Sequence, residues 1–419
     1  MLVFKFGGAS VKDAAGIANL AQIVKKYAHE QMLIVVSAMG KTTNALEVLA
    51  KAYFNEADDV HALYEDIKQY HYTILHELFD EAHPVFDEIA NTFVEIDWML
   101  EDKPVDTYDF IYDQLVSVGE LLSTRIVTAY LNHTGLTTKW LDVRGYIHTD
   151  NTYREGVVDW DKTCASIQQD VPALLTNGII VTQGFLGGTS ENFTTTLGRE
   201  GSDYTASIFA NCLQAESVTT WKDVPGILNA DPKFFNDTVK FDELSYTEAM
   251  EMTYYGASVI HPKTIKPLQN AGIPLLVKPF NNPDATGTII GKTENQRFEK
   301  AIIIVKQNQV LISLSAKDYS FISENHLSKV YLLFAQNQVK VNVMQTSALS
   351  LSVCFDWVEE RFMQLLSQLK QEFNVKYNNQ LSLITLRHYQ YDLLQELVNG
   401  KKVLLEQLSR NTAQVVVAG

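Results

Sequence analysis

One lysine and two glycines near the start of the chain have the types and spacing of a phosphate-binding site. Lys5 lies in the middle of the apolar run LVFKF (2–6), and Gly7 and Gly8 follow it directly. Glycines after a strand let the backbone come close to a phosphate, and their successive N–H groups form an anion-binding nest. The alternative is a solvated lysine on an edge strand before an ordinary Gly-Gly turn, and KFGG alone is a weak signal against it. The strand is otherwise wholly apolar, which makes a solvated lysine in its middle less favourable.

A second polar group lies in TTLGREGSDYTA (195–206), where a glycine-flanked arginine precedes a helix start. Arg199 is suited to grip a carboxylate with two parallel hydrogen bonds, and Asp203 to orient a neighbouring lysine. The alternative is an N-cap followed by a first-turn acid, which is common at helix starts. The arginine between glycines favours the functional interpretation.

Three further segments carry polar groups at strand or helix ends. In VVSAMGKTTNAL (35–46), Ser37 and Thr43 either cap a helix or, as a set with their neighbours, cradle an anion or carboxylate. Glu120 lies among apolar neighbours in SVGELLSTR (117–125), either on a solvated face or facing a substrate ammonium. The segment TWKDVPGILNADPK (220–233) has two Pro-containing turns, which suit a loop around a base and ribose or any other structured loop.

Two other patterns argue against P-loop chemistry and a protein-bound metal. GxxxxGK[ST] does not occur, so the phosphate site is not a P-loop. His261 precedes Pro262 at a probable helix start, which makes it a cap-region residue rather than a base or ligand. No HxxxH motif or Cys/His cluster is present, so no protein-bound metal is expected.

Strands that alternate with helices must position these groups. Apolar runs at 2–6, 32–38, 137–143, 178–185, 217–224, 273–280 and 287–291 predict an α/β sheet covered on both faces, with helical periodicity over 44–133. Ligands in such sheets lie at the strand ends where the glycines fall. After about residue 300 a βαββαβ order appears, and a second such order begins and stops after βαβ. We therefore expect a catalytic domain over 1–295 with a helical insert at about 44–133, a small α+β module at 300–379, and an incomplete one at 380–419.

Composition excludes several classes of function. The chain has 419 residues and a net charge of −16, with no basic block, which argues against nucleic acid and anionic membranes as partners. No apolar run approaches the length of a membrane span, and the N-terminus reads as a strand, so a cytoplasmic protein is expected. Cys164, Cys212 and Cys354 are scattered, which predicts neither a disulfide framework nor a structural zinc site.

Taken in order, these segments resemble the aspartokinases of the amino acid kinase superfamily. KFGGAS, VVSAMGKTTN, SVGELLSTR, TQGFLG, TTLGREGSDYTA, WKDVPGILNADP and YGASVIHP each look like an aspartokinase block, over about residues 2–292. The tail is similar to the ACT-domain pair of that family. The resemblance implies a three-layer αβα fold with a mainly parallel sheet, followed by ferredoxin-like ACT modules.

The resemblance also implies an activity and a site. The activity is transfer of the ATP γ-phosphoryl group to the β-carboxylate of L-aspartate, with Mg²⁺, as the first step towards lysine, threonine and methionine. Catalysis would fall to Lys5, Gly8 and Asp203. Aspartate would be held by Ser37, Thr43, Glu120, Phe185, Arg199 and Ser202. ATP would be held by Lys5, Gly7, Gly8, Ser10, Lys222, Asp223, Gly226, Leu228, Asp231, Lys233 and Ser258.

The chain departs from the family pattern at several positions. Glu200 stands where GRGGSD is common, and Lys222 replaces the threonine of WTDVPGIYTTDPR. Ser258 stands where a phosphate-binding lysine is expected, and we predict that Lys222 supplies the missing ammonium. In the segment KVNVMQTSA (340–348), similar to SVDLITTSE of lysine-sensing relatives, Asn342 replaces an aspartate, while Thr346 and Ser347 keep the hydroxyls.

These features lead to an expectation about control, and two alternatives remain open. We expect a homodimer joined through residues 300–419, with lysine inhibition weak or absent, or a tail that serves only for dimerisation. One alternative function is a degenerate kinase that only senses amino acids, which retention of Lys5, Glu120, Arg199 and Asp203 argues against. The other is a related carboxylate kinase such as glutamate 5-kinase.

Overall fold

The computed structural model describes residues 1–419 apart from 177, 258–259, 294–297, 299 and 419, so the expectation about Ser258 falls outside the described residues. The chain forms two compact units. The first unit holds the described residues of 1–227, 240–250 and 259–295, and the second holds those of 228–239, 251–258 and 296–419. Within the described ranges no helix is long and apolar enough to cross a membrane.

The first unit is built on an eight-stranded sheet with the order β3-β4-β2-β1-β7-β9-β10-β8. Its strands are β1 (Leu2–Phe6), β2 (Met32–Val36), β3 (Thr138–Leu141), β4 (Ile179–Gln183), β7 (Ser217–Lys222), β8 (Glu243–Ser245), β9 (Leu275–Pro279) and β10 (Thr288–Gly291). Neighbouring strands are parallel except for the antiparallel pair β9 and β10. The mainly parallel sheet that the sequence predicts is confirmed.

Strand β1 lies at the centre of this sheet, between β2 and β7. The edge-strand interpretation of Lys5 is therefore wrong. Phe4 and Phe6 point to one face, where each packs against Trp221 of β7 with ring centroids 5.7 and 6.1 Å apart. Because side chains alternate along a strand, Lys5 points to the opposite face.

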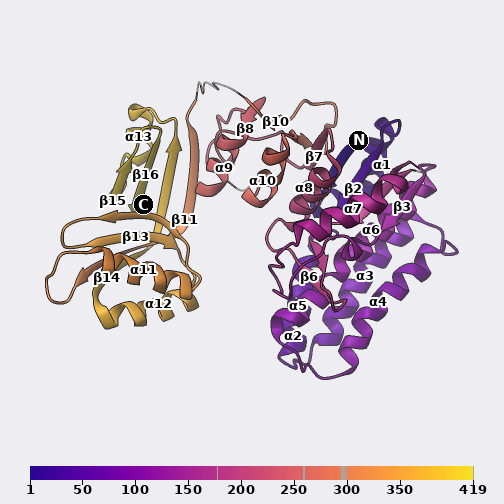
Figure 1. Ribbon diagram of the computed structural model, residues 1–419, viewed down its shortest axis with the longest axis horizontal. Coiled ribbons are helices and arrows are strands. Elements are labelled where there is room, and N and C mark those ends of the chain that lie inside the picture. Colours follow the sequence, from indigo (N-terminus) through magenta and orange to yellow (C-terminus); the bar gives the residue numbers. More distant parts are fainter. Residues whose placement is uncertain (177, 258–259, 294–297, 299, 419) are drawn as a thin grey trace. The chain divides into compact units, whose positions relative to one another are not determined.

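Helices cover both faces of the sheet (Figure 1). On the face of Lys5, α8 (Gly201–Leu213) contacts β1, β2 and β7, and α7 (Trp160–Leu175) and α10 (Pro262–Ala271) pack beside α8. On the other face, α6 (Val118–His133) contacts β2, β3 and β4. Helices α1 (Ala14–Lys26), α3 (Val60–Leu78) and α4 (Val85–Glu101) pack against α6.

Shorter elements connect this framework to the strand ends. They are η1 (Gly8–Val11), α2 (Thr42–Phe54), α5 (Tyr108–Val116), η2 (Val143–Gly145), the hairpin β5 (Leu186–Gly188) and β6 (Thr194–Thr196), and α9 (Tyr246–Tyr255). The helices from α2 to α6 occupy the stretch where the sequence shows helical periodicity. His261 Nδ1 accepts from the Lys263 N–H at 3.2 Å, so His261 caps α10 as its place before Pro262 indicated.

The second unit contains an antiparallel six-stranded sheet with the order β12-β13-β11-β14-β16-β15. The strands are β11 (Ile302–Ala316), β12 (Val341–Thr346), β13 (Leu351–Asp356), β14 (Phe373–Arg387), β15 (Lys402–Leu408) and β16 (Thr412–Ala418). Helices α11 (Glu324–Gln336) and α12 (Glu359–Glu372) share a core with β11 and β13. Helix α13 (Tyr391–Val398) lies in Figure 1 beside β15 and β16.

The pairing of β11 differs from the expectation for the tail. Residues 309–314 of β11 pair with β13, as expected for the first βαββαβ module. Residues 302–306 instead pair with 383–387 of β14, beside β16 and β15. The second module thus takes a fourth strand from upstream in the same chain, and the sequence interpretation that left its sheet short of strands is wrong. A register shift between Lys306 and Gln309 divides the two halves of β11.

Two of the cysteines contradict the expectation from their spacing. Cys164 of α7 and Cys212 of α8 form a disulfide with Cα atoms 5.0 Å apart, while Cys354 is free and buried. The packing of α7 against α8 brings the two cysteines together. The Gln168 side chain of α7 also joins these helices, since it donates to the Cys212 carbonyl at 2.8 Å. A separation of 48 residues carried no such signal in the sequence.

Reduction of this disulfide should destabilise the first unit by about 2–4 kcal/mol, because the open chain gains conformational freedom when unfolded. The measurement is thermal unfolding with and without dithiothreitol, beside Cys212→Ala, which should not respond to the reductant. Protein purified and denatured without reductant should show one titratable thiol, that of Cys354. Three thiols would contradict the disulfide.

Candidate active site

The centre of the site is a buried carboxylate shared by two lysines. Asp203, in the first turn of α8, lies 3.3 Å from the Lys5 ammonium and 3.5 Å from that of Lys222. Thr220 of β7, which is in register with Lys5 on β1, donates its hydroxyl to Asp203 at 3.3 Å. Strand alternation thus aims Lys5 and Thr220 at the same helix end.

Burial sets the electrostatics of this group. It lowers the pKa of Lys5, and the neighbouring Asp203 carboxylate opposes that change. Burial also disfavours the ionised form of Asp203, but the charges of Lys222 and Lys5 together hold its pKa below the ordinary value. Two ammonium groups beside one carboxylate leave a net positive charge, which suits a phosphate.

The two glycines after β1 allow a close approach of backbone segments. A Cβ on Gly8 would lie 2.6 Å from the Ala38 carbonyl oxygen, and the Gly40 N–H donates to the Gly8 carbonyl at 3.0 Å. Only glycine fits at position 8 without a shift of this backbone. Gly7 is less confined, since its Cβ would meet only the Lys5 ammonium, at 3.6 Å. The buried Ser10 donates its backbone N–H to the Gly7 carbonyl.

Glu120 is buried at the start of α6 and is not on a solvated face. Its Oε1 accepts from the Ala38 N–H at 3.3 Å, while the buried Oε2 has no hydrogen-bond partner among the described residues. Burial raises the pKa of Glu120 to about 8, and Ala38 and the Lys5 charge oppose that rise. A carboxylate with one unpartnered buried oxygen is suited to receive a cationic group.

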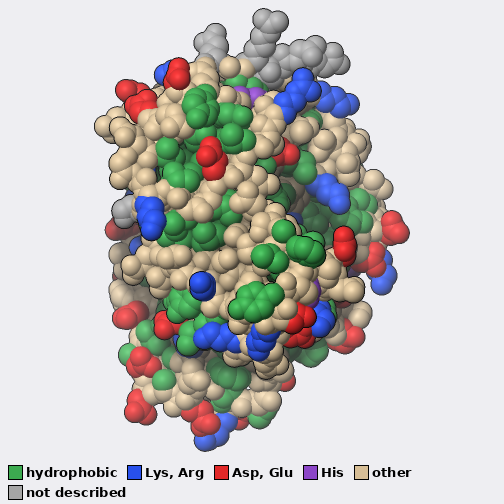
Figure 2. Space-filling model, turned by 90° about the vertical axis from the view of Figure 1, so that its left-hand side faces the viewer, with side chains coloured by type: hydrophobic (Ala, Val, Ile, Leu, Met, Phe, Trp, Pro, Cys, Tyr) green, Lys and Arg blue, Asp and Glu red, His purple; other side chains and the backbone are tan. Residues whose placement is uncertain are grey.

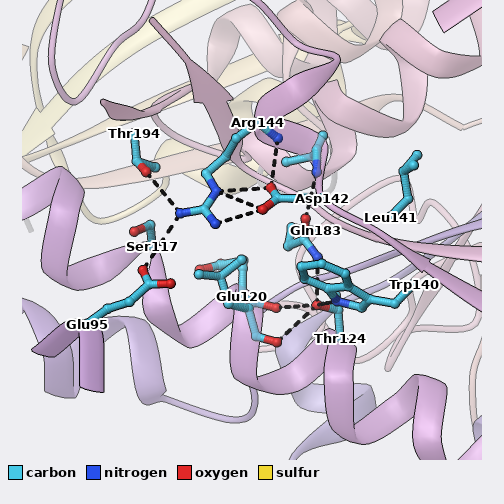
Figure 3. Close-up of polar contacts among 12 residues, drawn as sticks. Glu95, Ser117, Glu120, Thr124, Trp140, Leu141, Asp142, Arg144, Gln183 and Thr194 are labelled. Atoms are coloured by element: carbon cyan, nitrogen blue, oxygen red, sulfur yellow. Dashed lines mark hydrogen bonds and ion pairs between the residues drawn. The ribbon is translucent and has the colours of Figure 1, made fainter. Parts of the chain in front are cut away.

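A polar network fixes the helix behind Glu120 (Figure 3). The Thr124 hydroxyl donates to the Glu120 carbonyl at 2.8 Å and accepts from Trp140 and Gln183, each at 2.9 Å. Gln183, at the end of β4, also accepts from the Val143 N–H at 2.8 Å. The start of α6 is therefore tied to the ends of β3 and β4.

The residues expected to hold aspartate lie around the start of α8. Gly184 and Ser202 are in close contact, since a Cβ on Gly184 would lie 2.4 Å from that of Ser202. Phe185 has a φ of +71°, and its ring packs on Gly201, where a Cβ would lie 2.7 Å away. Arg199 is exposed in the turn before α8. Ser37 and Thr43 are half-buried, after β2 and at the start of α2.

The residues expected to hold ATP are only partly brought together. Lys222 ends β7, exposed Asp223 follows it, and Gly226 is buried with a φ of +146°. Leu228, Asp231 and Lys233 belong to the segment grouped with the second unit, where the Lys233 N–H donates to Asp231 at 2.9 Å. Their part in ATP binding stays a prediction, as does that of Ser258.

The three residues expected to hold an effector do not converge. The Asn342 carboxamide is engaged on both sides, accepting from Lys306 at 3.0 Å and donating to Gln309 at 2.8 Å. Ser347 is exposed, and its hydroxyl bonds Ser350 at 2.8 Å in a tight turn. Thr346 is exposed at the end of β12.

Two acidic residues at the site were not assigned a role from the sequence. Glu200, with a φ of +53°, has a buried Oε2 that bonds no group in the described part of the chain, and burial raises its pKa while Lys222 opposes the rise. Asp113 of α5 is fully buried and bonds β6. The signal that the sequence offered was an acidic residue in an apolar helical pattern, seven positions before Glu120.

Comparison with known proteins agrees with this geometry. Residues 1–279 match the family described as "Amino acid kinase family". The "Lysine-sensitive aspartokinase 3" of Escherichia coli (strain K12) is 32% identical over 357 residues, which cover 85% of this chain and 78% of that protein. The crystal structure of E. coli aspartokinase III with aspartate and ADP (R-state) superposes with a TM-score of 0.87 at 28% identity. That of the same enzyme with lysine and aspartate (T-state) gives 0.83 at 29%. Each alignment covers 100% of this chain and 96% of the solved one.

The mainly parallel αβα sheet, with a buried cluster of two lysines and an aspartate, and the match over residues 1–279 define the class: this chain belongs to the amino acid kinase family. Within that family its relatives and its complete fold are those of the aspartokinases.

Glu120→Gln should remove a pH-dependent loss of stability while keeping an acceptor for the Ala38 N–H. With a folded-state pKa of about 8, against an ordinary 4.5, the stability linked to Glu120 is complete below pH 4.5 and is lost as the pH rises to about 8. Thermal unfolding between pH 5 and 9 should therefore show the wild type falling relative to the variant. Glu77→Gln, on the exposed side of α3, serves as the control, and parallel curves for wild type and Glu120→Gln would refute the burial of a neutral carboxyl.

Proposed function

We propose that this chain transfers the γ-phosphoryl group of ATP to the β-carboxylate of L-aspartate, giving 4-phospho-L-aspartate. The observation that carries the proposal is the Lys5–Asp203–Lys222 cluster beside the Gly8 backbone, with the half-partnered carboxyl of Glu120 nearby. The complex of E. coli aspartokinase III with aspartate and ADP, which matches the whole chain, supports the pair of substrates.

The chemistry requires alignment and charge neutralisation rather than a base. A carboxylate is already ionised at pH 7, so it attacks phosphorus without loss of a proton. Lys5 and Lys222 would stabilise the charge on the transferring phosphoryl group and the leaving phosphates, and Asp203 would hold both ammonium groups in place. Gly7 and Gly8 would offer backbone N–H groups to the same phosphates.

The acceptor would lie between Glu120 and the start of α8. Glu120 would accept from the substrate ammonium through its unpartnered oxygen, and Arg199 would bind a carboxylate with two hydrogen bonds. Ser37, Thr43, Phe185 and Ser202 would complete the walls of this subsite.

The residues present fit a Mg²⁺ ion held mainly by nucleotide phosphates. At the turn before Asp203, Glu200 Oε2 is buried and accepts no hydrogen bond from the residues that the structure describes, so such an ion would find an oxygen ligand there. Mg²⁺, when bound, would neutralise charge that develops on the phosphates.

The deciding experiment is a coupled ADP-release assay with Mg·ATP and L-aspartate, L-glutamate or no acceptor. Turnover that requires aspartate and gives a hydroxylamine-trappable acyl phosphate is expected. Faster turnover with glutamate would favour a glutamate 5-kinase, and none with either would favour the purely regulatory alternative.

The wider biological setting is also part of the proposal. 4-Phospho-L-aspartate would feed the synthesis of lysine, threonine and methionine, and the cytoplasm stays the predicted location. The Cys164–Cys212 disulfide argues against that location, because disulfides are rare in the cytosol.

Lys5→Ala is expected to lower kcat by about 10²-fold or more while changing both KM values far less, because the ammonium matters most in the transition state. The fold should tolerate the change, since Asp203 keeps Lys222 as a partner. Steady-state kinetics with each substrate varied provide the measurement.

Lys222→Ala is the matched comparison, because it removes the other ammonium on Asp203. It should raise the KM for ATP and spare that for aspartate, and Ser258→Lys added to it should restore part of the loss. A Lys5→Ala enzyme with near-normal kcat would remove Lys5 from the catalytic role, and equal damage to both KM values in Lys222→Ala would remove Lys222 from ATP binding.

The second unit would form the homodimer contact and carry any control by amino acids. Large apolar side chains are exposed on it, among them Tyr319, Phe321, Leu332 and Met363, and Figure 2 shows such side chains among charged ones on the face turned to the viewer. Exposed apolar groups of this size are typical of contact surfaces. The effector subsite, if formed, would include Asn342, Thr346 and Ser347.

Lysine inhibition is expected to be weak, with half-inhibition above about 1 mM, a conventional metabolite-range affinity. The physical reason is that the protein's own Lys306 ammonium bonds Asn342 and pairs with Asp356 at 3.7 Å, where an effector ammonium would need a partner. Asn342→Asp alone should not restore inhibition, whereas Asn342→Asp with Lys306→Met should. Titration of lysine, threonine and methionine during turnover tests this, and half-inhibition of the wild type by lysine well below 1 mM would contradict it.

A further inference from the structure

We propose that Asp113 is a positioning residue that fixes the strand leading to Arg199 and thereby sets the spacing between Arg199 and Glu120. The inference rests on the proposed function, because it assigns those two residues to opposite ends of the acceptor. Asp113 touches neither substrate in this proposal and acts through β6.

Asp113 joins two segments that are far from it in sequence. Its Oδ2 accepts from the Arg154 N–H at 2.8 Å and from the Thr196 N–H at 2.9 Å. Its Oδ1 accepts from the Thr196 hydroxyl at 2.7 Å. The side chain is 0% exposed, so these three bonds replace the water that a carboxylate would otherwise hold.

The strand that Asp113 holds leads directly into the substrate-binding turn. β6 is a run of three buried threonines, and Gly198 and Arg199 lie two and three residues after its end. A Cβ on Gly198 would lie 3.3 Å from the Arg154 carbonyl oxygen, so the Arg154 loop supports the backbone just before Arg199. The Leu197 N–H donates to the Phe185 carbonyl at 2.8 Å, which links the same turn to a second substrate-site residue.

Other polar contacts hold the rest of β6, and Asp113 holds Thr196, the end of β6 that leads to Arg199. Gln114 donates to the Thr194 carbonyl at 2.8 Å and accepts from its N–H at 3.2 Å. Figure 3 shows Arg144 between Asp142, Glu95 and Thr194, at the opposite end of β6 from Arg199. Thr195 bonds Thr149 at 2.6 Å. Asp113 alone among the described residues bonds Thr196 through both its N–H and its hydroxyl.

The helical segment that carries Asp113 also carries Glu120. This segment would therefore set the distance between the two ends of the acceptor site. Asp113 lies in α5, α6 begins at Val118, and the Ser117 N–H donates to the Asp113 carbonyl at 3.3 Å, so the chain continues almost without a break to Glu120. One rigid segment thus fixes Glu120 by its own backbone and the Arg199 turn by the Asp113 carboxylate. A fixed spacing would favour one length of amino-dicarboxylate over another.

The charge of Asp113 is held at a cost in stability. Burial raises its pKa to about 6, although its three hydrogen bonds oppose the rise. The other charged or titratable groups that face it are Arg154, Tyr112 and Tyr153, with Asp109 and Glu47 around Arg154. A raised carboxyl pKa means that stability is lost as the pH rises from about 4 to 6, although the three bonds favour the ionised form.

The test is Asp113→Asn, which keeps the size of the side chain. Its amide NH₂ would face one of the groups that now donate to the carboxylate, so at least one of these hydrogen bonds would be lost. We expect kcat/KM for aspartate to fall by about 10- to 100-fold, since a small misplacement of a positioning group costs this much. The KM for ATP should change less than about twofold, and preference for aspartate over glutamate should fall by about tenfold, the value of one methylene. Below about pH 6, protonation of Asp113 should lower the wild-type kcat/KM for aspartate. The pH profile of the variant should lack this decrease.

Asp109→Asn is the matched control, because Asp109 lies one turn earlier on α5 and pairs with Arg154 at 3.5 Å without bonding β6. It should leave all these quantities near the wild-type values. An unchanged KM for aspartate and an unchanged pH profile in Asp113→Asn would overturn the inference while aspartate turnover by the wild type still stood. Absence of that turnover would overturn the proposed function instead.

A second variant keeps the test decisive if Asp113→Asn does not fold. Thr196→Val removes one donor to Asp113 and leaves the charge in place, so its fold is less at risk. It should raise the KM for aspartate about threefold, the loss of one hydrogen bond, and leave the KM for ATP unchanged. Equal changes in both KM values would overturn the inference.

Discussion

The site depends on one buried carboxylate that two lysines share. Asp203 is 4% exposed, and without its lysines it would be an uncompensated buried charge, which proteins rarely retain. Conversely, Lys5 and Lys222 would repel each other without Asp203, because each lies within 3.5 Å of it. The three charges therefore require one another, and they leave an excess of one positive charge, which the neighbouring Glu200 offsets when it is ionised. The rest of the first unit can be understood as the means of bringing β1, β7 and α8 to that point.

Strand geometry provides that means. Phe4 and Phe6 pack on Trp221 on one face of the sheet, so Lys5 between them must face the other side. There it meets α8, whose first turn contains Asp203. The register of β1 with β7 then sets Thr220 beside Lys5 on the same face. A shift of either strand by one residue would turn these polar groups into the apolar layer behind the sheet, so the apolar packing enforces the catalytic register.

Short-range patterns in the sequence were enough to predict much of this, and long-range pairings were not. The apolar strand around Lys5, the glycines and the polar start of α8 each showed a local pattern, and the structure confirms the parallel sheet that they imply. The disulfide, the use of residues 302–306 by the second ACT-like half, and the bonds of Asp113 to β6 join positions 48 to 85 residues apart. Locally, Asp113 showed only an acidic residue in an apolar helical pattern, which many solvated acids share, and two of its three donors are backbone N–H groups that any sequence would supply.

Two departures from the family pattern are better understood together than apart. Lys222 adds a positive charge where threonine is common, and Glu200 adds a negative one where glycine is common. Among the charged groups near Glu200, Lys222 has the largest effect on its pKa, and it opposes the rise that burial causes. An acid at position 200 by itself would repel phosphates and would carry the strain of a left-handed backbone for no gain. Beside Lys222 the same acid leaves the net charge of the cluster as it would be with threonine and glycine, so the extra lysine reaches Asp203 without making the site more positive.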